Sequence, residues 1–67
     1  MPLGLIPAQR TMDPRQAERC KKARADGTII TEKFGSAMVT GKVKSVVDHE
    51  DANPRQWSIT FFDATMH

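Results

Sequence analysis

The fold class of this 67-residue chain is decided by the stretch MVTGKVKSVV, residues 38–47. Valines at positions 39, 43 and 47 fall on one face of an extended strand, and the opposite face is mostly polar. This alternation predicts a strand of an antiparallel sheet, packed on one side and hydrated on the other. The stretch is about twice the usual strand length, and Gly41 within it indicates a bulge or bend.

Two further strands flank this stretch. Residues 28–34 are rich in β-branched side chains and end at a Gly-Ser turn, and residues 56–62 alternate again after a polar connection that contains Asn53-Pro54. The three segments together predict a three-stranded antiparallel β-meander. Its predicted core consists of Ile30, Phe34, Val39, Val43, Val47, Trp57, Ile59 and Phe61.

A helix is predicted before the strands, over residues 14–25. Asp13 is a favoured N-cap, Pro14 suits the first helical position, and Asp26-Gly27 supplies a stop. The apolar stripe of this helix is made of Ala17, Cys20 and Ala23, all of them small. Such a stripe allows close approach to a sheet but buries little area.

The ends of the chain complete an α+β domain that spans residues 1–67. Residues 1–12 form an apolar arm with Pro2 and Pro7, which we expect to lie extended along a sheet edge or a partner. The alternative to a three-stranded sheet is one with a fourth, edge strand contributed by this arm. Residues 63–67 are expected to fray.

The composition limits the class of protein. Apolar residues make up 39% of the chain and charged residues 27%, values of an ordinary globular domain. A single cysteine, Cys20, allows no internal disulfide and no four-ligand Cys/His zinc framework. The N-terminus lacks the positive flank of a signal peptide, and no apolar run approaches the roughly 20 residues of a membrane span. These features favour a cytoplasmic protein.

Three strands and a thin helix would leave one sheet face and two strand edges uncovered. We therefore expect a homodimer, formed by strand pairing or by segment exchange. Apolar residues outside the predicted core would supply the contact: Leu3, Leu5, Ile6, Met38, Val46 and Phe62. The favoured function on this basis is a non-catalytic protein-interaction module.

An uneven charge distribution supports a second function, nucleic-acid binding. Residues 1–25 carry six Lys or Arg against two acidic residues, whereas the remainder carries four against six. A basic stripe on the helix can follow a phosphate backbone. The candidate contacts are Arg15, Arg19, Lys21, Lys22 and Arg24 on the helix, with Lys42 and Lys44 as auxiliaries.

Catalysis has little support in the sequence. No residue pattern indicates a catalytic site, a cofactor or a metal centre, so the chain is not expected to be an enzyme. The acidic segment 48–51 is interpreted as a solvated turn, because adjacent loop residues impose little coordination geometry. Cys20 is interpreted as a small packing residue rather than as a nucleophile, since no oriented base accompanies it.

Overall fold

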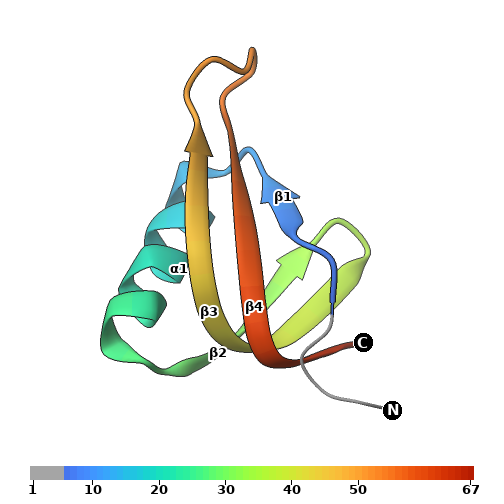
Figure 1. The fold of residues 1–67 in the computed structure, drawn as a ribbon. Coiled ribbons are helices and arrows are strands. Elements are labelled where there is room, and N and C mark those ends of the chain that lie inside the picture. The colour runs from blue at the N-terminus through green and yellow to red at the C-terminus, as the bar shows by residue number, and fades with distance from the viewer. Residues whose placement is uncertain (1–5) are drawn as a thin grey trace.

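One antiparallel sheet and one helix make up the computed structural model, which describes residues 6–67 (Figure 1). The elements are β1 (Gln9–Thr11), α1 (Pro14–Asp26), β2 (Ile29–Phe34), β3 (Ala37–His49) and β4 (Gln56–Met66). The strands lie in the order β1-β4-β3-β2. The α+β class is therefore confirmed. The count of three strands was incomplete, and the alternative of a fourth edge strand from the arm is confirmed, because Gln9–Thr11 pairs with β4 at one edge.

The helix has the ends that its sequence predicts. The Asp13 side chain accepts a hydrogen bond from the Arg15 backbone N–H at 2.9 Å, and Gly27 ends the helix in the left-handed region at φ 69°. Both ends follow from local chemistry, so the predicted bounds differ from the observed ones by one residue. The stripe of small residues is buried against the sheet.

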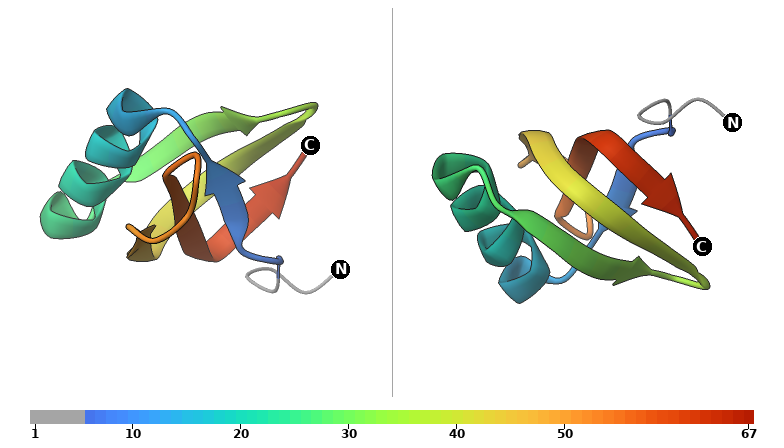
Figure 2. Two further views of the ribbon diagram at one scale, coloured as in Figure 1. Left: turned by 90° about the horizontal axis from the view of Figure 1, so that it is seen from above. Right: turned by 90° about the horizontal axis from the view of Figure 1, so that it is seen from below.

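Two irregularities in the pairing of β3 with β4 curl the sheet (Figures 1 and 2). In the first, β4 has two residues, Asp63 and Ala64, where β3 has only Gly41. The backbone of Asp63 has a positive φ angle of 49°. This bulge confirms the bend predicted at Gly41. In the second, β3 contains one extra residue, Lys44, between the pairs Val43–Phe61 and Ser45–Thr60.

After the second bulge, the side chains of β3 that face the core are the opposite set from the one that regular alternation predicts. A one-residue insertion moves every following side chain to the other side of a sheet. Val46 consequently packs against the core, whereas Val47 is 50% exposed. The sequence-based placement of Val47 in the core and of Val46 on the opposite face is therefore wrong.

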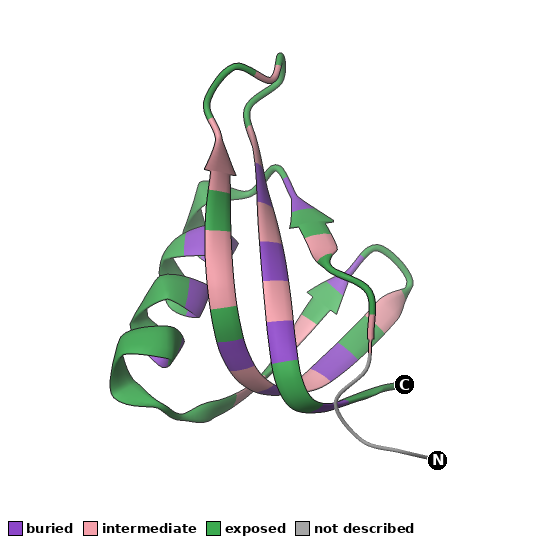
Figure 3. Cartoon of the chain, in the orientation of Figure 1, coloured by how far each residue is buried: buried purple, intermediate pink, exposed green. Residues whose placement is uncertain are grey.

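The core lies on the inner face of the curled sheet, where α1 covers it (Figure 3). Ile59, Val39 and Cys20 are fully buried, and Phe61 packs edge-on against Phe34 with 5.8 Å between ring centroids. Burial raises the pKa of the Cys20 thiol to about 11, so this side chain stays protonated and packs as a small apolar group. Ile30, predicted to be in the core, is half-buried at its margin.

The C-terminal residues are paired rather than frayed. β4 continues through Met66, and His67 exchanges two backbone hydrogen bonds of 2.7 Å with Met38. The expectation that residues 63–67 fray is wrong, because β3 begins at Ala37 and its first residues pair with this end of the chain. Within residues 6–67, no helix combines the length and the apolar character that a membrane crossing requires.

Candidate functional site

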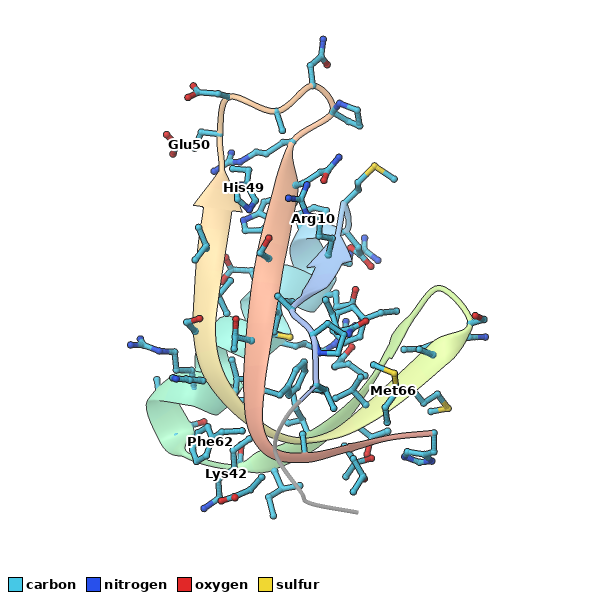
Figure 4. All side chains as sticks on the ribbon, turned by 45° about the vertical axis from the view of Figure 1, so that its right-hand side comes forward. Arg10, Lys42, His49, Glu50, Phe62 and Met66 are labelled. Atoms are coloured by element: carbon cyan, nitrogen blue, oxygen red, sulfur yellow. The ribbon has the colours of Figure 1, made fainter. Side chains whose placement is uncertain are left out.

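Among residues 6–67, no helix or loop covers the face of the sheet opposite the core. The pairing register places Ile29, Lys42 and Phe62 in one row across β2, β3 and β4 on this side. Figure 4 shows Phe62 beside Lys42. We call this side the outer face and assign to it Arg10, Ile29, Thr31, Lys33, Met38, Thr40, Lys42, Ser45, Val47, His49, Gln56, Ser58, Thr60, Phe62, Thr65 and His67. Each of these residues is exposed or half-buried, so the face is open to a partner.

Acidic side chains are unevenly distributed between the two faces of the sheet. The outer face carries Arg10, Lys33 and Lys42, and its register positions include no carboxylate among the described residues. The carboxylates lie on the helix and its cap, on the inner face, in the β3–β4 loop and in the β4 bulge: Asp13, Glu18, Asp26, Glu32, Asp48, Glu50, Asp51 and Asp63. The outer face is thus cationic in a chain whose net charge is only +2.

Hydroxyl groups and imidazoles on the outer face are joined by hydrogen bonds. Thr40 Oγ1 lies 2.8 Å from Thr31 Oγ1 and 3.0 Å from His67 Nε2, which links β2, β3 and the residue that follows β4. Nearer the β3–β4 loop, His49 Nε2 lies 2.7 Å from Ser58 Oγ. These contacts hold polar side chains in place on the sheet, as a preformed binding surface requires.

The basic helix predicted as a nucleic-acid contact is largely engaged within the protein. Arg19 donates two hydrogen bonds of 2.9 Å to Glu32, and Arg24 Nε donates to the Lys44 carbonyl at 2.9 Å. Lys21 lies 3.4 Å from a carboxylate oxygen of Glu18. The remaining helical candidates, Arg15 and Lys22, form no ion pair with residues 6–67. The helix covers the inner face, so the structure does not bring its cations together with Lys42.

The Arg19–Glu32 contact makes stability depend on pH. Hydrogen bonds from Arg19 hold the pKa of the half-buried Glu32 carboxyl below its ordinary value of 4.5. A group whose pKa is lowered by folding stabilises the fold fully above its unfolded pKa. That stabilisation is lost as the pH falls through the lower, folded value.

Glu32→Gln is therefore expected to lower the urea midpoint at pH 7, by an amount that shrinks toward pH 3. The variant removes the charge that Arg19 stabilises, and wild-type Glu32 loses the same charge in acid. Glu18→Gln is the matched control, because the Glu18 side chain is 74% exposed, and it should change the midpoint little at either pH. An equal loss for Glu32→Gln at both pH values would contradict the argument.

The strand edges are partly protected. Gln16 Nε2, in a buried side chain, donates to the Lys33 carbonyl at 2.8 Å on the free side of β2. Arg24 covers the Lys44 carbonyl in the same way, beyond the point where the pairing of β2 with β3 ends. Side chains that cover an edge hinder pairing with a second chain. Edge-to-edge strand pairing therefore has less support than the sequence suggested.

The predicted dimer contacts separate into three groups. Met38 and Phe62 lie on the outer face and are 38% and 41% exposed. Ile6 packs against the core together with Val46. Leu3 and Leu5 lie outside the described residues.

The acidic loop is tied to its surroundings by Arg55. This guanidinium donates two hydrogen bonds to Asp48, lies 5.2 Å from the Trp57 ring centroid, and holds the pKa of the Asp48 carboxyl below its ordinary value. An open hollow of about 460 Å³ lies between Arg10 and residues 48–52. No group of three or more His, Cys, Asp or Glu side chains in the described part of the chain is arranged to hold a metal ion.

No protein-family model, curated protein or solved structure matches this chain. The outer face is therefore the feature of this protein from which a function can be inferred. Sequence reasoning missed Arg10, Ile29 and Lys33 as parts of that face. The alternation in residues 28–34 already places Ile29 and Lys33 on one side of a strand, but only the register aligns Ile29 with Lys42 and Phe62.

Proposed function

We propose that this protein is a non-catalytic module that binds nucleic acid on the outer face of its sheet. The observation that carries the proposal is an uncovered face that presents Arg10, Lys33 and Lys42 and has no carboxylate at its register positions among residues 6–67. Such a surface attracts a polyanion and releases the counterions of its phosphates on binding.

The other polar groups of the face favour phosphate and sugar contacts. Threonine and serine hydroxyls such as Thr31, Thr40 and Thr65 lie between the cations. Nucleic-acid backbones are bound by this combination of Lys and Arg with Ser and Thr donors. The exposed Phe62 adds an apolar surface that simple phosphate binding does not require.

Lys33→Ala/Lys42→Ala is expected to weaken nucleic-acid binding and to reduce the slope of log K against log salt by about two, one for each phosphate contact. Fluorescence anisotropy with labelled DNA and RNA, between about 50 mM and 200 mM salt, measures both quantities. The matched control is Arg15→Ala/Lys22→Ala, which removes the same charge from the helix. The control should leave the slope nearly unchanged.

Two results would count against this proposal. If the two double variants lose affinity equally, net charge rather than the outer face governs binding. If the wild-type protein binds neither DNA nor RNA, or binds without salt dependence, the module does not act on nucleic acid.

A homodimer that mediates protein interaction is the second candidate. It is favoured by exposed apolar side chains on the outer face, with Ile29 65%, Met38 38% and Phe62 41% exposed. Face-to-face pairing of two copies would, however, bring Lys33 and Lys42 toward the cations of the other copy. Sedimentation equilibrium at micromolar concentration tests this candidate, and a folded monomer would remove it.

A further inference from the structure

We infer that Phe62 is a base-stacking platform and that the outer face thereby prefers single-stranded to double-stranded nucleic acid; this inference rests on the proposed function. The Phe62 ring lies on the open side of β4, directly opposite Lys42 of β3. Lys42 in turn lies opposite Ile29 of β2, so the aromatic ring and the cation occupy one row of the sheet.

The exposure of Phe62 follows from strand geometry. Phe61 occupies the inner face and is 2% exposed, so strand alternation directs the next side chain outward. Phe62 therefore lies outside the core, and together with the exposed Ile29 it places apolar surface on both sides of Lys42.

The row of Phe62 and Lys42 combines the two groups that bind single strands. Sequence-tolerant proteins stack bases on aromatic rings and hold the adjoining phosphates with cations. Directly opposite residues in antiparallel strands have Cβ atoms about 5 Å apart. One nucleotide can therefore place its base on Phe62 while its phosphate contacts the Lys42 ammonium.

A duplex cannot use the same row fully. Its bases are already stacked and paired, so their ring faces are not available to an aromatic side chain on the surface of a sheet. Duplex binding would retain the contacts of Lys33, Lys42 and Arg10 with phosphate but not the stacking contact. Phe62 should therefore contribute to the binding of single strands alone.

The test compares a single-stranded oligonucleotide of about 15 nucleotides with its duplex, using the full chain. Phe62→Ala is expected to weaken single-strand binding about tenfold or more and to leave duplex binding within about twofold. Its salt slope should equal that of the wild type, because no charge is removed. Phe62→Trp should retain single-strand binding. Its indole fluorescence should change with the single strand but not with the duplex, whereas the wild type, whose one indole is that of Trp57, should show no such difference.

The outcomes separate this inference from the proposed function. Absence of binding to either nucleic acid by the wild type refutes the proposed function and this inference with it. Salt-dependent binding that Phe62→Ala leaves unchanged, or weakens equally for single strand and duplex, refutes only the stacking role. A wild-type dimer that Phe62→Ala converts into a monomer would assign Phe62 to contact between copies instead. If Phe62→Ala does not fold, the fluorescence of Phe62→Trp decides the question.

Discussion

Gly41→Ala is expected to lower the free energy of unfolding by about 3 kcal/mol, the upper part of the usual range for overpacking. A Cβ atom at position 41 would lie 2.5 Å from Ala64 Cβ, 2.7 Å from Ala64 Cα and 3.2 Å from the Asp63 carbonyl oxygen. Two of these three atoms belong to the backbone of the β4 bulge, so they cannot move aside as a flexible side chain would. A domain of this size has about 3–10 kcal/mol of stability in total, so the variant should lose between about a third and all of it.

Urea unfolding followed by circular dichroism measures this loss, with Gly35→Ala as the matched control. Gly35 has φ 63°, and a Cβ atom added there would meet no other atom within 4 Å, so its substitution costs only backbone strain of about 1 kcal/mol. Adding Ala64→Gly to Gly41→Ala should restore part of the stability, because it removes the nearest atom. If Gly41→Ala costs no more than Gly35→Ala, the strands are not as close at this bulge as the structure places them.

Phe61→Ala is expected to cost about 3–5 kcal/mol, a large part of the about 3–10 kcal/mol that stabilises a domain of this size. The Phe61 ring is 2% exposed and packs edge-on against Phe34 in the centre of the core. Its loss removes a large apolar surface and leaves a cavity that neighbouring strands cannot fill. Thermal unfolding followed by circular dichroism measures the effect.

The matched control is Phe62→Ala, the same substitution at the next residue. Phe62 lies on the opposite face and is 41% exposed, so its removal should change stability by less than about 1 kcal/mol. Similar losses for the two variants would show that consecutive side chains of β4 do not alternate between core and solvent. That result would also remove the structural basis of the stacking role of Phe62.

The predicted and observed faces of β3 agree as far as Val43 and disagree beyond it. Alternation is a local property, and it correctly placed Val39 and Val43 inside. The bulge at Lys44 depends on how β3 aligns with β4, and nothing in the local pattern of residues 43–47 reveals it. The placement of Val46 and Val47 was therefore wrong for a reason that only the partner strand supplies.

The candidate binding surface lies on the sheet, whereas the sequence predicted it on the helix, for a related reason. The sequence indicated a basic stripe on the helix, because charges at helical spacing can be read along one segment. Whether a cation is free depends on distant residues, and Glu32 and the Lys44 carbonyl engage Arg19 and Arg24. The outer face is assembled from strands that are far apart along the chain, so its charge could be described only after the register was known.

Local chemistry alone was enough to determine the helix with its Asp13 and Gly27 caps, the central strands and the α+β class. These features depend on side chains within a few residues of one another. The tertiary structure decided between three strands and four, with Gln9–Thr11 as the fourth. It alone revealed the pairing of His67 with Met38 and, within residues 6–67, the outer face without acidic side chains. Each of these features joins segments that are distant in sequence. Strand register determines which side chains share a face, and the whole sheet specifies that register.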